Sequence, residues 1–304
     1  MLSVRSVNPR MQDREREVKN MLSLQGGPVS PDVQGIVHPR ECEYSACYRT
    51  YFFGQFRLFA QGKPVKETMW RRNKVKALLK WFLLNPGKLC SADEFIDLFW
   101  HDVALETASG NLYVTIHCLR HLLEPTLSPR EASKFIRRQS NNFYWFEMDE
   151  TWWTDIVDVQ HLFDTARAFD ACGDDVKASF YYRKVVSHCC LGFLPEDESE
   201  QWLRPYRQHY EYIYLQVLLR LIQIYQKRGE LEEVLEYAYL ALSLDAYCEP
   251  AMKAIIDMYF KQGNMGMAMR RLDDFGTLLQ QELGVEPSKE MHALRMRIMK
   301  MGER

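Results

Sequence analysis

Hydrophobic residues recur with a helical period in three stretches between residues 69 and 125. The first stretch, Met69–Leu84, places five apolar residues at i, i+3 and i+4 spacing: Val75, Leu78, Leu79, Phe82 and Leu83. The second begins at Ser91, where Glu94 three residues later completes a capping-box pattern, and it runs to about Trp100. The third begins after Glu106 and ends at Pro125. The pattern therefore predicts three consecutive helices.

Short runs of β-forming residues flank these helices. Five apolar residues precede them, in runs on both sides of a turn at Gln61-Gly62-Lys63: Tyr51, Phe53, Phe56, Leu58 and Val65. After the helices, Phe135–Arg138 and Phe143–Phe146 flank Ser140-Asn141-Asn142, which predicts a hairpin because Asn tolerates left-handed turn conformations. Strands, three helices and a terminal hairpin in about 100 residues are typical of a winged helix-turn-helix. We therefore predict an α+β winged-helix domain over residues 49–150.

The third predicted helix has one apolar face and one polar face. At about 100° per residue, four residues share the apolar face: Leu112, Ile116, Leu119 and Leu123. The opposite face carries Gly110, Val114, His117, Cys118 and His121, with Asn111 at its edge. In a winged helix this face enters the major groove of double-stranded DNA. Val114 would then contact a thymine methyl group, and Asn111 a base edge.

Basic and polar side chains near this helix are candidates for further DNA contacts, chiefly to phosphates. We assign this role to Arg120 of the third helix, to Arg137, Arg138 and Asn141 of the hairpin, and to Arg71, Arg72, Lys74 and Lys76 of the first helix. The alternative is a solvated, mildly basic surface. Charge and periodicity alone leave both interpretations open.

Residues 151–304 are predicted to be helical almost throughout, and they contain a repeat. Gly229 and Gly263 lie 34 residues apart, which is the tetratricopeptide period. Gly173 fits the same frame if one period plus an insertion holding Gly192–Pro205 separates it from Gly229. Five residues after each glycine stands a residue that lets two helices pack closely: Ala178, Val234 or Ala268. This half is therefore predicted to be an all-α, tetratricopeptide-like bundle.

Several segments together carry a family resemblance. MWRRNKVKALLKWFLLNPGKLCSADEFIDLFW (Met69–Trp100) followed by NLYVTIHCLRHLLEP (Asn111–Pro125) resembles the OmpR-type winged helix of SARP activators, the bacterial antibiotic-regulatory proteins. Residues 231–264, Leu162–Asp174 and QELGVEPSKEMHALRMRI (Gln281–Ile298) resemble the bacterial transcriptional activation domain (BTAD) of the same family. The resemblance covers about residues 50–300, and it places the two domains in the family's order.

The resemblance implies a transcriptional activator that binds promoter repeats through its winged helix. For the helical domain it implies RNA polymerase subunits as partners and self-association as a homodimer. This sequence departs from the family at Cys118 and His121, where arginines are usual, and at Asn141-Asn142, where Pro-Gly is common. Because Cys cannot make the bidentate contact that Arg makes to guanine, we expect altered or weak base readout. An interaction adaptor with weakened DNA readout is the second hypothesis, and a redox- or ligand-sensing regulator built around Cys118 is the third.

The charge distribution agrees with this division into domains. The whole chain has a formal net charge of −2, which on its own argues against nucleic acid. However, residues 49–150 hold 15 basic and 11 acidic residues, whereas residues 151–304 hold 18 basic and 24 acidic ones. Residues 1–48 hold six of each and a Gly/Pro-rich stretch, so we expect a partly disordered N-terminal extension there.

Sequence patterns of common enzymes are absent. The chain contains no GxxxxGK[ST], GxGxxG, GxSxG or HExxH, so we predict a protein that is not an enzyme, with no catalytic residues, cofactor or metal. His117 and His121 lie at i, i+4 and could form part of a metal site, but no third ligand is evident. No apolar run approaches the roughly 18 residues of a membrane span, and no secretory signal opens the chain, so we expect reduced cysteines and a cytoplasmic location.

Three further clusters have simpler interpretations. The acidic run Glu196-Asp197-Glu198 is interpreted as a solvated loop, and Trp152-Trp153 as core at a domain junction. An aromatic run is interpreted as helix packing in preference to a groove: Trp202, Tyr206, Tyr210, Tyr212 and Tyr214.

Overall fold

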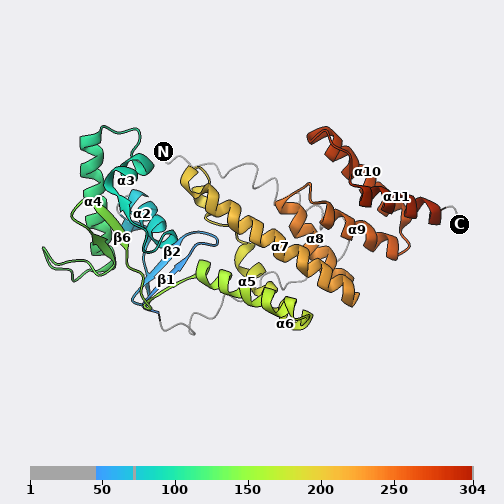
Figure 1. Ribbon diagram of the computed structural model, residues 1–304, viewed down its shortest axis with the longest axis horizontal. Helices are drawn as coiled ribbons and strands as arrows, with labels where there is room; N and C mark the ends of the chain where they lie inside the picture. The colour runs from blue at the N-terminus through green and yellow to red at the C-terminus, as the bar shows by residue number, and fades with distance from the viewer. Residues whose placement is uncertain (1–45, 71–72, 303–304) are drawn as a thin grey trace, which may run out of the picture. The chain divides into compact units, whose positions relative to one another are not determined.

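The computed structural model describes residues 46–70 and 73–302, and these form two compact units. The N-terminal unit comprises described residues up to 158 together with 193–205, and the helical unit comprises 159–192 with 206–302 (Figure 1). The N-terminal unit therefore extends past the predicted boundary at residue 150 and takes in most of the predicted insertion. Residues 1–45 of the predicted N-terminal extension lie outside the described residues.

Two small sheets belong to the N-terminal unit. Their strands are β1 (Tyr48–Tyr51), β2 (Arg57–Ala60), β3 (Lys63–Pro64), β4 (Cys90–Ser91), β5 (Ile136–Arg138), β6 (Phe143–Phe146) and β7 (Trp152–Thr154). One sheet has the order β3-β2-β1-β7, in which β1 runs antiparallel to β2 and parallel to β7. The other has the antiparallel order β4-β6-β5 and contains the predicted hairpin. Trp152 is buried as predicted, stacked on Tyr48 with 4.5 Å between ring centroids, but it lies on a strand that the pattern did not reveal.

The helices of this unit form the predicted winged helix. They are the 3₁₀ turns η2 (Glu67–Trp70), η3 (Pro195–Asp197) and η4 (Gln201–Leu203), and the α-helices α2 (Asn73–Leu84), α3 (Ala92–Phe99) and α4 (Leu105–Leu123). Both α2 and α3 pack on α4, and α2 also packs on β6 (Figure 1). The Ser91 capping box is present, with the Glu94 amide donating to Ser91 Oγ (3.2 Å) and the Ser91 amide to Glu94 Oε2 (2.7 Å). These bonds hold the pKa of Glu94 below its usual range.

Aromatic rings fill the core between α2, α3 and β6. Phe82, Phe95 and Phe146 are fully buried. The Phe82 and Phe95 rings meet edge to face with 5.4 Å between centroids, and Phe146 lies 6.0 Å from Phe82. The core therefore joins the helices to the sheet that carries the hairpin, which fixes the direction of that hairpin relative to α4.

Residues 193–205 are fastened to the N-terminal unit by a buried cation. Lys80 has only 2% of its side chain exposed, and its ammonium pairs with Glu196 Oε1 at 3.3 Å and with Asp197. The Phe56 amide also donates to Glu196 Oε1 (2.8 Å). The interpretation of this acidic run as a solvated loop was therefore wrong, because a cation 116 residues away in the chain needs these carboxylates.

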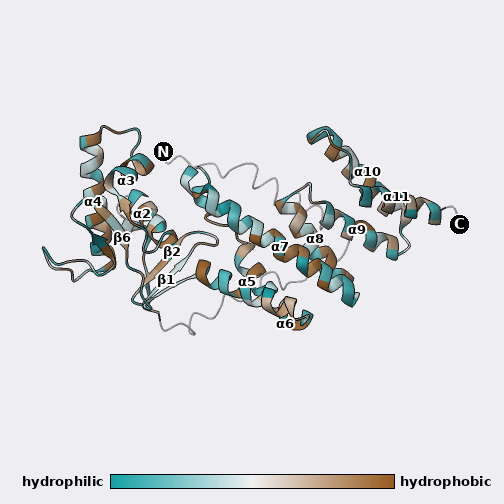
Figure 2. Cartoon of the chain, in the orientation of Figure 1, coloured by the Kyte–Doolittle hydropathy of each residue, from teal (hydrophilic) through white to brown (hydrophobic). Residues whose placement is uncertain are grey.

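The helical unit consists of successive helical pairs. Its helices are α5 (Asp155–Ala171), α6 (Asp175–Cys189), α7 (Arg204–Arg228), α8 (Leu231–Leu244), α9 (Glu249–Lys261), α10 (Met265–Glu282) and α11 (Lys289–Gly302). The pairs α8–α9, α9–α10 and α10–α11 pack on one another. Hydrophobic and hydrophilic residues alternate around these helices, as amphipathic packing requires (Figure 2).

The predicted repeat frame is present in the backbone. Gly173, Gly229 and Gly263 have φ of 75°, 76° and 76°, and each ends the first helix of a pair in the left-handed conformation that glycine adopts without strain. The three residues that follow in the frame are fully buried between helices: Ala178, Val234 and Ala268. The prediction of helix packing for the aromatic run holds for Tyr214, which is buried, but not for Tyr212, which is 62% exposed.

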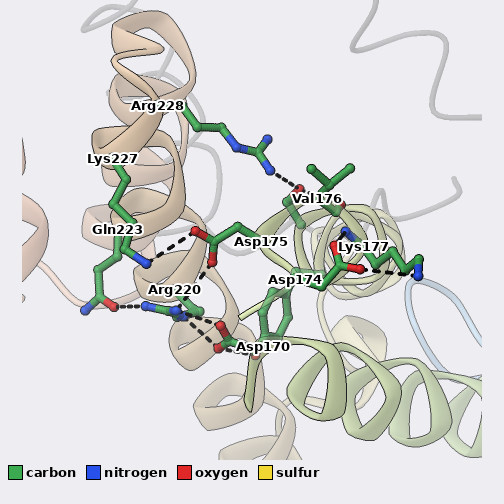
Figure 3. Close-up of polar contacts among 11 residues, drawn as sticks. Asp170, Asp174, Asp175, Val176, Lys177, Arg220, Gln223, Lys227 and Arg228 are labelled. Atoms are coloured by element: carbon green, nitrogen blue, oxygen red, sulfur yellow. Dashed lines mark hydrogen bonds and ion pairs between the residues drawn. The ribbon is translucent and has the colours of Figure 1, made fainter. Parts of the chain in front are cut away.

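An ionic network joins the first three helices of this unit (Figure 3). Arg220 of α7 donates two hydrogen bonds to Asp170 of α5, from Nε (2.7 Å) and Nη2 (2.6 Å). Lys227 of α7 pairs with Asp175 of α6 at 3.3 Å. The Arg220 guanidinium holds the pKa of Asp170 below its usual range.

Candidate nucleic-acid interface

Helix α4 has the apolar face and the polar face that the spacing of its hydrophobic residues predicts. Leu112, Ile116, Leu119 and Leu123 are between 0% and 3% exposed and form the core face. On the opposite face Gly110, His117 and His121 are exposed, and Val114 is 38% exposed. Cys118 and Asn111 are half-buried at the margin of this face. The side chains predicted to meet DNA bases therefore lie together on the solvent side of one helix.

The β5–β6 hairpin forms the wing beside α4. Arg138 pairs in register with Tyr144, and Asn142 takes a left-handed turn conformation with φ of 58°, as predicted for this Asn-rich turn. The Arg138 guanidinium lies 5.7 Å from the Tyr144 ring centroid and donates to Asn142 Oδ1. Arg138 and Asn141 are exposed and Arg137 is half-buried, so the wing presents two cations.

Arg120 has a different place from the one predicted. Its Nε and Nη2 groups donate to the Ile136 carbonyl oxygen, at 3.2 and 2.8 Å. Burial lowers the pKa of the Arg120 guanidinium. These two bonds tie α4 to β5, so Arg120 positions the wing relative to the helix.

Two basic residues of the first predicted helix, Lys74 and Lys76, are only partly accessible. Arg71 and Arg72 lie outside the described residues. Lys74 is half-buried, with its ammonium 5.9 Å from the Phe99 ring centroid. Lys76 pairs with Glu67 at 2.9 Å, which reduces its availability for a phosphate.

Tyr113 is a candidate contact that the sequence analysis missed. Its side chain is 66% exposed on α4, and it lines a small concavity with His117, Arg120, Arg138 and Tyr144. The signal was a large aromatic residue beside the polar face of the predicted helix, but the sequence analysis considered only the residues opposite the apolar face.

The two histidines on the solvent face of α4 lie against each other. The His117 and His121 ring centroids are 4.3 Å apart, and His121 Nδ1 lies 3.1 Å from the His117 carbonyl oxygen. Within the described residues, no group of three or more His, Cys, Asp or Glu side chains is placed to hold a metal ion. The pair therefore contributes polar, aromatic surface to this face of α4.

The helical part of the chain matches a known protein family. Residues 189–299 match the family model of the bacterial transcriptional activator domain. The match confirms the predicted resemblance of the helical part to the bacterial transcriptional activation domain.

Solved structures support the same architecture. The chain is similar to Mycobacterium tuberculosis EmbR, solved in complex with a low affinity phosphopeptide, with a TM-score of 0.69 and 17% identity. That match covers 84% of this chain, which spans 65% of the EmbR chain. It confirms the predicted fold, a small N-terminal α/β region followed by a helical bundle.

Two other comparisons do not extend this similarity. The C-terminal tetratricopeptide-containing domain of a Plasmodium falciparum FK506-binding protein matches at a TM-score of 0.36 and 15% identity, covering 50% of this chain and 94% of that one. None of the curated proteins compared matches the chain. Among the described helices, none combines the length and apolar character that a membrane span requires.

Proposed function

We propose that this protein is a DNA-binding transcriptional activator whose winged helix binds promoter repeats. One observation carries the proposal: the solvent face of α4 lies beside a wing bearing Arg137 and Arg138, in a chain whose residues 189–299 match the family model of the bacterial transcriptional activator domain. A helix of this length fits the major groove, and a cationic hairpin beside it can contact the flanking phosphates.

The helical unit is proposed to contact RNA polymerase subunits and a second copy of the chain. Its family match supports a role in activation. The excess of acidic residues over residues 151–304 disfavours DNA as its ligand, because phosphates would repel it. In this arrangement, one unit binds the promoter and the other recruits the transcription machinery.

A mobility-shift titration of the full chain tests DNA binding. The DNA upstream of the protein's own gene is compared with random DNA at two salt concentrations. We expect specific binding that weakens as the salt concentration rises. Arg137→Ala and Arg138→Ala should each reduce this binding while the chain stays folded. Arg270→Ala, an exposed arginine of α10, is the matched control and should leave the shift unchanged. Equal binding of both DNAs, insensitive to the wing variants, would contradict the proposal.

An interaction adaptor is the second candidate function, and the placement of Arg120 favours it. The one arginine of α4 is bonded to β5, so the helix offers no guanidinium to a guanine. A Cys118→Arg variant separates the two functions. A marked rise in DNA affinity would show that this face meets bases, whereas capture of RNA polymerase by the full chain without any DNA affinity in either form would favour the adaptor.

A further inference from the structure

The solvent face of α4 is poor in cationic side chains. Among the 19 residues of this helix, Arg120 is the single arginine and there is no lysine. Arg120 is half-buried and bonded to the Ile136 carbonyl. Arginine or lysine paired with guanine is the commonest specific contact in the major groove. The helix therefore lacks the side chains that would select guanine by that contact.

Val114 occupies the middle of the exposed face. It is one helical turn after Gly110 and seven residues before His121, so these three residues lie in one line along the helix. Its side chain is 38% exposed although it is apolar and β-branched. In the major groove, the one apolar group on a base edge is the C5 methyl of thymine.

Gly110 has no role that the fold explains. It lies inside α4 without a left-handed φ, and a Cβ built there would meet nothing within 4 Å. Glycine in a helix interior is destabilising relative to alanine. A glycine at an exposed helical position fits a site where another molecule comes close to the backbone.

We propose that α4 reads thymine methyl groups, with Val114 as the specificity-determining side chain and Gly110 allowing the helix to approach the bases closely. This inference rests on the proposed DNA-binding function and names the base that the site selects. The sites preferred by the full chain should therefore carry T·A pairs where α4 meets the groove.

The first test removes single methyl groups from the DNA. Binding sites are selected from random duplexes with the full chain, and each thymine is then replaced by uracil, which differs only by that methyl. We expect one or two thymines whose replacement weakens binding about three- to fivefold, the effect of losing one buried methyl-sized group. Val114→Ser should weaken binding to thymine DNA and abolish the difference between thymine and uracil, whereas Val114→Thr, which keeps a methyl, should retain part of it.

The second test adds a methyl group to the protein. Gly110→Ala should raise the unfolding midpoint slightly but weaken binding to the selected DNA by about fivefold or more, because the new Cβ occupies space needed by the bases. Gly266→Ala is the matched control, since Gly266 is also helical and its Cβ would also meet nothing within 4 Å, but it lies on α10. It should leave DNA affinity unchanged.

The outcomes separate this inference from the proposed function. If no sequence is enriched and affinity does not respond to the wing arginines, the DNA-binding function itself fails. If a site is enriched but every uracil substitution is neutral, or the uracil effect persists in Val114→Ser, thymine reading by Val114 is overturned. Unchanged affinity in Gly110→Ala would overturn the close approach.

Discussion

At the scale of single residues, Lys80 shows how strongly a buried charge constrains its surroundings. Its ammonium is enclosed by Glu196, Asp197 and the Phe56 ring, whose centroid lies 4.9 Å away. Removing an ion from water costs several kcal/mol, and only close, opposite charges offset that cost. Residues 193–205 therefore belong to the N-terminal unit although 34 residues of the helical unit precede them in the chain.

Replacing Lys80 should reveal this cost. We expect Lys80→Ala to lower the free energy of unfolding by about 2–4 kcal/mol, because it leaves two facing carboxylates without their cation and creates a cavity. Lys80→Met keeps the apolar stem and should cost less, about 1–2 kcal/mol. Denaturant unfolding of the full chain measures both values. Lys63→Ala, at an exposed position on β3, should change stability by less than about 0.5 kcal/mol, and an equally small effect at Lys80 would contradict the argument.

At the scale of elements, Arg120 couples α4 to the wing. Arg120→Met removes two hydrogen bonds from a charged donor to the Ile136 carbonyl and should lower the free energy of unfolding by about 1.5–3 kcal/mol. DNA affinity should also fall, because the wing loses its fixed position beside the helix. Arg138→Ala should reduce affinity alone, since Arg138 is exposed. Denaturation and mobility shift of both variants check this contrast; equal stability of Arg120→Met and the unmodified chain would refute the coupling.

The network around Asp170 makes the helical unit sensitive to acid. Hydrogen bonds from Arg220 lower the pKa of Asp170 in the folded state. Their contribution is therefore present above the unfolded pKa near 3.9 and is lost as pH falls through the lower, folded pKa. We expect Asp170→Asn to cost about 1–2 kcal/mol at pH 7 and the difference from the unmodified chain to shrink below about pH 4. Thermal unfolding followed by circular dichroism across this pH range measures it.

A surface pair in the same unit provides the control. Asp273 pairs with Arg295 at 2.9 Å, but both side chains are about half exposed. Asp273→Asn should therefore change the free energy of unfolding at pH 7 by less than about 1 kcal/mol. If Asp170→Asn and Asp273→Asn lowered the free energy of unfolding equally, the burial of the Asp170 network would not contribute to stability.

Elements with a local signal were predictable from the sequence. The core face of α4, from Leu112 to Leu123, follows from a helical period that needs no knowledge of the rest of the chain. The Ser91 cap depends on a residue three positions away. The glycine frame at Gly229 and Gly263 is a repeat with a known structural meaning. In each case the residues that determine the structure are close in sequence or evenly spaced.

Contacts between distant segments were not predictable in this way. Nothing near Lys80 indicates that its partners lie more than a hundred residues later. Arg120 donates to a backbone carbonyl, and because every residue has one, the sequence does not indicate this partner. The three-residue strand β7 exists because β1 is available to pair with it. For the candidate site, this means that the exposed face of α4 was predictable, whereas the hydrogen bonds of Arg120 to the Ile136 carbonyl oxygen were not.

At the scale of the whole molecule, charge separates the two halves. The near-neutral total combines an excess of basic residues over 49–150 with an excess of acidic residues over 151–304. A salt-dependent affinity for DNA therefore depends on a small number of cations. Five of the cations that the sequence pattern assigns to phosphates are Arg71, Arg72, Lys74, Arg137 and Arg138.

The salt dependence of binding measures how many of these cations act. Each phosphate contact contributes a slope of about −0.9 to the plot of log affinity against log salt concentration, so five contacts predict about −4 to −5 per bound chain. Arg138→Ala should make the slope shallower by about one, whereas Arg270→Ala should not change it. Fluorescence anisotropy at several salt concentrations gives these slopes. A slope near zero would mean that the basic residues of this half do not meet phosphates, because an uncharged contact releases no counterions.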